Sequence, residues 1–234
     1  MLTILDPRER NQPFPDVGEA LIEPNGLLAV GGCLSPQRLE SAYRRGIFPW
    51  YGEGEPILWW SPDPRLILFP EALKVSRSLS KTLRRGEFNF SFDTRFAEVV
   101  EACAEPRAYA TGTWIMPEMK RAYLQFHRLG FAHSFEAWRG GRLVGGLYGV
   151  AIGRVFFGES MFHRVSDASK AAFAFAVECL KQWGYRLIDC QVYTDHLASL
   201  GATEIPRAEF VRLLDDYCCQ PAALSAWQRE DAGG

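Results

Sequence analysis

Three β-prone runs joined by very short glycine turns constrain the fold of this chain more than any other feature. The runs cover Phe131–Trp138, Arg142–Ile152 and Arg154–Met161, and the turns between them contain Gly140-Gly141 and Gly153. Turns this short join neighbouring antiparallel strands, because a parallel connection needs a crossover of about a dozen residues or more. The sequence therefore predicts a three-stranded antiparallel meander.

The segment after the meander predicts one further strand, which runs parallel to its neighbour in the sheet. Ala168–Trp183 has the length of a helix, with Asp167 or Ser166 as its candidate N-cap and Gly184 as its stop. The β-prone run Arg186–Tyr193 follows directly. A helix of this length can carry the chain back across a sheet, so we expect the new strand to pair in parallel with the meander.

The first 60 or so residues differ from the rest in their pattern of turns and helices. Turns rich in glycine and proline surround one clear helix, for which Ser35 is the N-cap, Pro36 the first residue and Gly46 the end. We expect a small N-terminal α/β domain over residues 1–62. Residues 63–234 are expected to form a larger α+β domain, with a mixed, mainly antiparallel sheet flanked by helices.

Start and stop signals predict the remaining elements. They are a strand at Leu66–Phe69 and helices at Arg77–Arg85 behind Ser76, Thr94–Cys103 behind Asp93, Pro117–Leu129, Asp195–Leu200 and Arg207–Tyr217. The tail from Gln220 onward lacks such signals and is expected to be weakly ordered.

Charge and cysteine usage exclude several classes of protein. With 234 residues and a net charge of -2, the chain has no global basic field, so any contact with nucleic acid must come from a local cluster. The six cysteines include no C-x-x-C pair and the four histidines are scattered, so neither a zinc site nor a disulfide framework is indicated. No export signal or long apolar span is visible, and a soluble cytoplasmic protein is expected.

Two polar residues interrupt the apolar run of the last long strand. Strict alternation places Asp189 and Gln191 on one face and Ile188, Cys190 and Val192 in the opposite packing layer. A buried charge costs several kcal/mol unless it is paired, so these polar residues indicate a site between the strands. The alternative interpretation is that Asp189 only binds backbone amides at the end of its strand.

The order of helices, meander, helix and parallel strand resembles the GNAT acyltransferase fold. In that fold the two strands that flank the last crossover splay apart and hold the acyl donor in the gap. Here these strands carry Glu159 on one side and Asp189 and Gln191 on the other. The glycine-rich signature with which acetyl-CoA users wrap a pyrophosphate is missing from Phe162–Lys170, so coenzyme A is not the expected donor.

Seven motifs in order resemble one family more closely, the bacterial leucyl/phenylalanyl-tRNA-protein transferases. They are Glu23–Gly32 (EPNGLLAVGG), Arg45–Trp50 (RGIFPW), Trp59–Arg65 (WWSPDPR), Gly112–Ile115 (GTWI), Gly158–Phe162 (GESMF), Leu187–Val192 (LIDCQV) and His196–Ala202 (HLASLGA). The resemblance implies transfer of leucine or phenylalanine, with methionine also open, from aminoacyl-tRNA to proteins with an N-terminal arginine or lysine. Such proteins are thereby marked for degradation by the N-end rule pathway.

The reaction needs little assistance, because the donor is an activated ester and an α-amino group has an ordinary pKa of about 7.7–8.0. By the resemblance, Asp189, Gln191 and Glu159 are the catalytic residues and no metal or other cofactor takes part. Gln191 contacts the attacking amine and is oriented by Asp189, since an amide is not itself a useful base. Whether Asp189 removes the proton or only positions groups stays open.

Glu159 conflicts with strict alternation, because the resemblance places both Phe156 and Glu159 at the donor site. A β-bulge at Gly158 would resolve the conflict by resetting the alternation, and we predict one there. Glu159 could then accept a hydrogen bond from the donor's amino group. The alternative is an ordinary ion pair of Glu159 with Arg154 or Arg186.

The resemblance also implies an apolar slot for the aminoacyl side chain. Its residues are Trp50, Trp114, Leu147, Phe156, Phe173, Ala176 and Leu180. Without the resemblance, the last three would be taken as core, because they share one face of a helix.

A basic stripe is the expected tRNA contact. It consists of Arg77, Lys81, Arg84 and Arg85, spaced along one helix face. An isolated stripe of this kind is more often only a solvated surface, and the need to hold RNA phosphates favours the functional interpretation. Trp59 and Trp60 either frame the terminal adenosine of the tRNA or join the two domains.

Two other functions remain to be weighed. A coenzyme-A-dependent N-acetyltransferase would share the fold but lacks the glycine loop. A non-catalytic tRNA-binding module would not need polar residues in the gap between the strands.

Overall fold

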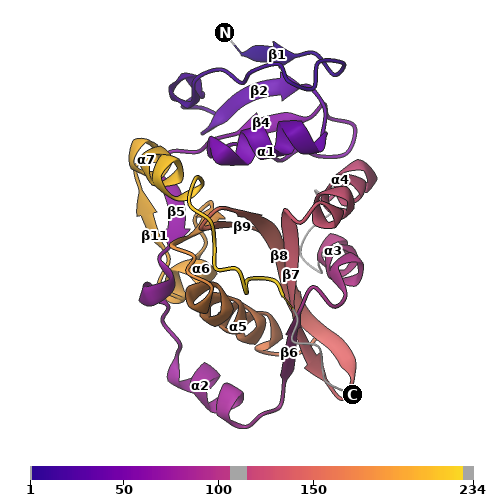
Figure 1. Cartoon of the computed structure of the whole chain (residues 1–234), viewed down its shortest axis with the longest axis vertical. Coiled ribbons are helices and arrows are strands. Elements are labelled where there is room, and N and C mark those ends of the chain that lie inside the picture. The colour runs from indigo at the N-terminus through magenta and orange to yellow at the C-terminus, as the bar shows by residue number, and fades with distance from the viewer. Residues whose placement is uncertain (1, 106–114, 229–234) are drawn as a thin grey trace.

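Two β-sheets organise the chain, and the computed structural model describes residues 2–105 and 115–228 (Figure 1). The smaller sheet has the order β1-β2-β4-β3. Its strands are β1 (Thr3–Leu5), β2 (Leu27–Gly31), β4 (Leu58–Trp60) and β3 (Phe48–Pro49). β1 is parallel to β2, whereas β4 is antiparallel to both of its neighbours.

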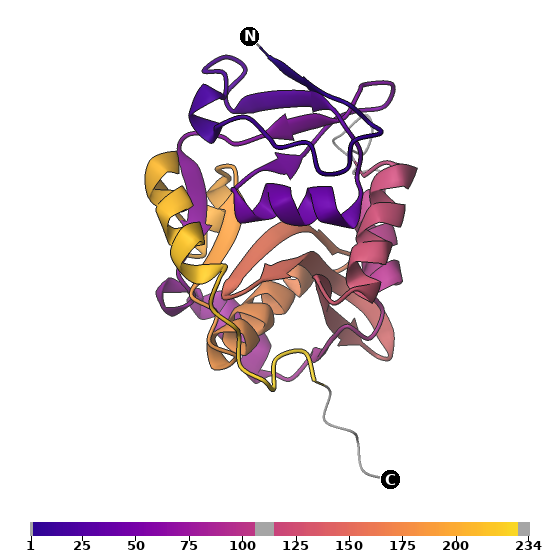
Figure 2. The same cartoon turned by 45° about the horizontal axis from the view of Figure 1, so that its top comes forward.

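Helix α1 (Pro36–Arg44) lies between the small sheet and the large one, as Figure 2 shows. The hydroxyl of Ser35 accepts the backbone N–H of Arg38 at 3.3 Å and caps the helix. Gly46 follows its end with φ of +71°. A Cβ at Gly46 would lie 2.8 Å from the Phe210 ring, so close packing as well as backbone conformation requires glycine there. The expected helix and both of its end signals are confirmed.

The large sheet has seven strands in the order β11-β5-β10-β9-β8-β7-β6. Their bounds are β11 (Thr203–Ile205), β5 (Arg65–Leu68), β10 (Leu187–Gln191), β9 (Val155–His163), β8 (Arg142–Ile152), β7 (Ala132–Arg139) and β6 (Asn89–Phe92). β7, β8 and β9 form the predicted antiparallel meander, and β10 pairs with β9 in parallel as predicted. The α+β class with a mixed, mainly antiparallel sheet is confirmed.

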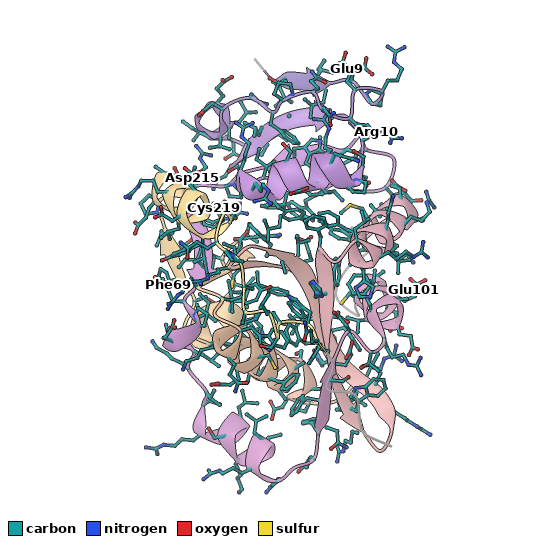
Figure 3. The ribbon with its side chains drawn as sticks, in the orientation of Figure 1. Glu9, Arg10, Phe69, Glu101, Asp215 and Cys219 are labelled. Carbon is teal, nitrogen blue, oxygen red and sulfur yellow. The ribbon has the colours of Figure 1, made fainter. Side chains whose placement is uncertain are left out.

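Helices cover both faces of the large sheet (Figure 1). The helix α5 (Ala168–Gln182) packs on one face together with α2 (Arg77–Arg84). The helices α3 (Phe96–Ala104) and α4 (Pro117–Arg128) pack on the other face, and an ion pair between Lys120 of α4 and Glu101 of α3 joins them. Glu101 is labelled in Figure 3. Each face therefore has its own apolar core.

The C-terminal part of the chain returns to both sheets. It contains α6 (Asp195–Ser199) and α7 (Arg207–Tyr217). Two short 3-10 helices, Val17–Glu19 and Pro70–Ala72, occur earlier in the chain. Arg44 of α1 donates to the carbonyl of Cys218 at 3.0 Å, just past α7, where Figure 3 labels Cys219. The tail then packs on the sheet through Trp227, whose indole N–H donates to the Tyr185 hydroxyl at 2.8 Å. The expectation of a weakly ordered tail is thus wrong at Trp227.

Two predicted helix caps are wrong. α3 begins at Phe96, two residues later than expected, because Asp93 at φ +51° binds elsewhere: its carboxylate accepts from the Ser134 backbone N–H and contacts His133. Asp167 precedes α5 but has φ of +64° and makes no capping hydrogen bond. The first turn of α5 is therefore left without a side-chain cap. The edge strands β6 and β11, which the sequence did not predict, each pair along one side with a neighbouring strand.

Further sequence expectations concern domain limits and chemistry. The domain boundary between residues 62 and 63 stays a prediction. All six cysteines lie within the described residues, and none is in a disulfide. Within residues 2–105 and 115–228, no helix combines the length and apolar character that a membrane span requires.

Candidate active site

A cavity opens where β9 and β10 separate. Their parallel ladder pairs Leu187 with Val155 and ends at Asp189 opposite Phe157. Beyond this point both strands line a cavity of about 1170 Å³, whose other walls come from β3, β8 and the first turns of α5 and α6. Splaying of these strands is the arrangement expected from the sequence, and it brings Glu159, Asp189 and Gln191 to one place.

A β-bulge places Glu159 in this gap. Tyr148 pairs with Ser160 and the next residue, Gly149, pairs with Gly158, so Glu159 is an extra residue on β9. Both Phe156 and Glu159 consequently line the cavity, which strict alternation would not allow. The predicted bulge at Gly158 is confirmed.

Three hydrogen-bond donors surround the carboxylate of Glu159. The Tyr43 hydroxyl from α1 donates to Oε1 at 2.8 Å, the Tyr123 hydroxyl from α4 donates to Oε2 at 2.6 Å, and Gln191 Nε2 donates to Oε1 at 3.0 Å. The two tyrosine hydroxyls also contact each other at 2.5 Å. Among the described residues Glu159 makes no ion pair with Arg154 or Arg186, and Arg154 instead donates to the carbonyl of Pro221 at 3.0 Å. The alternative of an ordinary ion pair is therefore wrong.

Burial dominates the electrostatics of Glu159. It raises the pKa of the carboxyl group from 4.5 to about 7, although the hydrogen bonds from Tyr123 and Tyr43 act in the opposite direction. Burial, together with the charge of Glu159, raises the pKa of both tyrosines well above 10, so they stay protonated donors. Glu159 is therefore a carboxyl group that changes charge near neutral pH.

Asp189 is held differently, in a buried pair with Arg65. Arg65 Nε and Nη2 donate to its two carboxylate oxygens at 2.8 and 2.6 Å, and both side chains are almost wholly buried. The guanidinium lies between the rings of Phe48 and Phe210, 4.8 and 4.7 Å from their centroids. Asp189 also accepts the backbone N–H of Gln191 at 2.9 Å, so the alternative interpretation describes one of its bonds but not its main partner.

A second irregularity separates the roles of Asp189 and Gln191. The register of β10 against β5 shifts between these residues, and Gln191 has φ of +64°. Strict alternation therefore fails: Asp189 faces Arg65, whereas the Gln191 amide reaches across the gap to Glu159. Val192, expected in the opposite packing layer, is about half exposed and lines the cavity, so that expectation is wrong.

The apolar walls of the cavity include four of the seven residues expected in a slot. These are Trp50, Leu147, Phe156 and Phe173, and Ile188 and Met161 join them. Ala176 and Leu180 lie further along α5 in the core and do not contribute to the walls that the described residues form. Trp114 lies outside the described residues.

The paired tryptophans have separate environments. Trp59 is fully buried, donates its indole N–H to the Gly31 carbonyl at 2.8 Å and packs against Phe14 within the small sheet's core. Trp60 donates to the Trp50 carbonyl at 2.6 Å and packs edge-on against the Trp50 ring. Trp60 thus supports a residue of the cavity wall.

The basic stripe lies on the exposed side of α2. Arg85 approaches Glu87 at 3.6 Å, and Arg84 donates to the carbonyl of Ser80 within the helix. α2 adjoins the cavity, because its Thr82 hydroxyl donates to Asp167, a residue of the cavity wall, at 3.3 Å. The helix that carries the stripe is therefore connected to the cavity wall through Thr82.

One further cluster holds groups of the kind that bind metals. Asp93, His127 and His133 lie close together, with all three ligand atoms within 4.8 Å of one another. Three of the four ring nitrogens have protein partners: His127 Nδ1 contacts the Ala132 carbonyl at 2.7 Å, and the two nitrogens of His133 contact Asp93 and the Gly130 carbonyl. These contacts join β6, β7 and α4, which is a structural role.

The fold is of the α+β class, and a cavity lined by polar and apolar side chains opens where two of its strands separate. Family models described as leucyl/phenylalanyl-tRNA protein transferase and its N-terminal domain match residues 67–215 and 32–63. A leucyl/phenylalanyl-tRNA–protein transferase of Methylococcus capsulatus is 66% identical over 97% of each chain, and one of Nitrosomonas eutropha is 58% identical over 92% of each chain. This chain belongs to the leucyl/phenylalanyl-tRNA protein transferase family and is a transferase.

Similarities to solved structures are more distant. L-PGS from Bacillus licheniformis superposes with a TM-score of 0.40 at 12% identity, covering 69% of this chain and 54% of that chain. A GCN5-related N-acetyltransferase from Kribbella flavida superposes with a TM-score of 0.37 at 13% identity, covering 72% and 59%.

Proposed function

We propose that the protein transfers leucine or phenylalanine, with methionine as a further donor, from aminoacyl-tRNA to the N-terminal arginine or lysine of acceptor proteins. The modified proteins are thereby marked for degradation in the cytoplasm. Family membership supports the aminoacyl-tRNA donor and the protein acceptor. The observation that carries the proposal is the Gln191–Glu159 contact, which puts an amide and a carboxylate across the gap beside an apolar wall.

The apolar wall is the proposed slot for the aminoacyl side chain. Leu147, Phe156, Phe173 and Ile188 supply aliphatic and aromatic surface without a charged group among them. A leucine or phenylalanine side chain gains free energy there by leaving water. The ester carbonyl then lies toward the polar end of the cavity, where the acceptor amine attacks it.

Gln191 is the proposed contact for the attacking amine. Its Nε2 is occupied by Glu159, so Oε1 is the atom left to accept an N–H from the acceptor. Asp189 supports this geometry through the Gln191 backbone N–H. Because Arg65 binds both oxygens of Asp189, we assign Asp189 a positioning role and not proton removal.

Glu159 is the proposed acceptor of the proton that the amine loses. The amine nitrogen forms a bond to the carbonyl carbon and gives its proton to Glu159, the bond from that carbon to the ribose 3′ oxygen breaks, and the leaving oxygen takes up the proton that Glu159 received. A carboxyl group with a pKa of about 7 is well matched to this task at neutral pH. Tyr43 and Tyr123 hold the carboxylate in place from two separate helices.

A single-turnover assay tests the proposal directly. Leucyl-tRNA and a peptide that begins with arginine should give a peptide longer by one leucine, detected by mass spectrometry. The same peptide with an acetylated N-terminus is the control and should not react. Acetylation of the free peptide from acetyl-CoA, without transfer from leucyl-tRNA, would refute the proposal and favour the N-acetyltransferase alternative.

A further inference from the structure

Three basic side chains gather at the mouth of the cavity from three different elements. His163 ends β9, Lys170 lies in the first turn of α5, and His196 lies in α6, and all three line the cavity. Among the described residues, none of these side chains has a hydrogen-bond or ion-pair partner. We call these three residues the cationic mouth.

Lys170 and His163 act electrostatically on His196. Burial lowers the pKa of His196 below 6.5, and the nearby positive charges of Lys170 and His163 lower it further. Of the acidic groups in this part of the wall, Glu105 pairs with Arg164 at 2.6 Å, and Asp167 accepts from the Thr82 hydroxyl at 3.3 Å without forming an ion pair with the three basic residues. A bound anion would relieve the repulsion between these basic groups.

The first turn of α5 adds neutral donors at the same place. Ser169 is only 7% exposed and lines the cavity, yet its hydroxyl has no hydrogen-bond partner among the described residues. The turn also lacks a side-chain cap, because Asp167 makes no capping hydrogen bond. A hydroxyl without a partner in the cavity wall is free to donate to a ligand, and uncapped N–H groups at a helix start favour a bound anion.

We propose that Ser169, Lys170, His163 and His196 bind a phosphodiester of the RNA donor, the one that links its terminal nucleotide to the preceding nucleotide. The inference rests on the proposed function, since the reacting ester is attached to that terminal nucleotide. The glycines that would wrap a pyrophosphate are missing from residues 162–170, so side chains and one helix end hold a single phosphate.

The test compares donors with and without this phosphate. Leucyl-adenosine has none, whereas a leucyl-CCA trinucleotide and leucyl-tRNA contain it. We expect Lys170→Gln to lower kcat/KM for leucyl-CCA roughly tenfold, as for one partly exposed charge-assisted hydrogen bond, and to change transfer from leucyl-adenosine less than about twofold. Ser169→Ala should act in the same direction with a smaller effect. Lys181→Gln, an exposed lysine at the far end of α5, is the matched control and should change neither.

Salt dependence gives a second readout. Loss of one phosphate contact should reduce the log-log salt slope of leucyl-tRNA binding by roughly 0.7, the value for single-stranded RNA. The inference is overturned if Lys170→Gln lowers transfer from leucyl-adenosine as much as from leucyl-CCA, or if the slope is unchanged. Failure of the wild type to transfer leucine from any of the three donors would instead refute the proposed function.

Discussion

The raised pKa of Glu159 predicts a pH-dependent loss of stability that its replacement by glutamine removes. In the folded protein the carboxyl group titrates near 7, and its ordinary value is 4.5. Between these values the unfolded chain has released the proton while the folded protein still binds it. Raising the pH therefore favours unfolding, and the difference corresponds to about 3 kcal/mol once the pH exceeds 7.

Urea unfolding at intervals from pH 4.5 to 8.5 measures this effect. Subtracting the free energy of unfolding of Glu159→Gln from that of the wild type cancels other titrating groups. The difference should fall by about 3 kcal/mol across the range, with most of the change between pH 4.5 and 7. In Tyr123→Phe the pH range over which stability falls should extend to higher pH. The Tyr123 hydrogen bond lowers the pKa of Glu159 in the wild type, so its loss should raise that pKa further. A difference that stays flat with pH would refute the assignment of Glu159 as a buried group that titrates near neutrality.

Four further predictions follow from the same structure. Arg65→Met leaves the Asp189 charge buried without its partner and should cost about 3–5 kcal/mol in urea unfolding; a cost below about 1 kcal/mol would contradict the buried pair. Gly149→Ala places a Cβ 2.6 Å from the Phe156 ring and 2.3 Å from the Phe157 carbonyl oxygen. It should lower the free energy of unfolding by about 1–3 kcal/mol and raise KM for leucyl-tRNA, and unchanged values of both would argue against the slot. Neutralising the whole basic stripe should flatten the salt dependence of tRNA binding, because its four contacts account for a loss of affinity of roughly 50- to 150-fold between 50 and 200 mM salt. An unchanged slope would show that the stripe does not bind tRNA phosphates. Isoleucyl-tRNA should react more slowly than leucyl-tRNA in single-turnover assays because of its branch at Cβ, whereas equal rates would show that the slot has been misplaced.

Local patterns predicted the architecture because each depends on neighbouring residues. Glycine turns specified the meander, and the helix-length crossover specified the parallel strand. The bulge at Gly158 followed from a conflict, since Phe156 and Glu159 could not both reach the site on a regular strand. The short edge strand β6 was missed, because its four residues follow a helix closely and become a strand only through pairing with β7.

The partners of the site residues could not be predicted, because they are distant in sequence. Arg65 lies 124 residues before Asp189, and the pairing of β5 with β10 that brings them together has no local signal. Tyr43 and Tyr123 lie on the apolar faces of two amphipathic helices, where aromatic residues are usually core. The charge of Glu159 within an apolar strand indicates that hydrogen-bond donors lie near it. The sequence does not indicate which residues supply those donors.

The separate partners of Asp189 and Gln191 explain why an amide follows a carboxylate on β10. A carboxylate at position 191 would face Glu159 at hydrogen-bond distance, and two neighbouring carboxylates would not both ionise near neutral pH. Glutamine instead donates one N–H to Glu159 and leaves a carbonyl oxygen for the substrate. The charge of Asp189 is paired with Arg65, so it holds the Gln191 backbone as part of a buried ion pair, and its negative charge also helps to raise the pKa of Glu159. The register shift between Asp189 and Gln191 therefore separates a buried ion pair from the amide that we propose contacts the substrate.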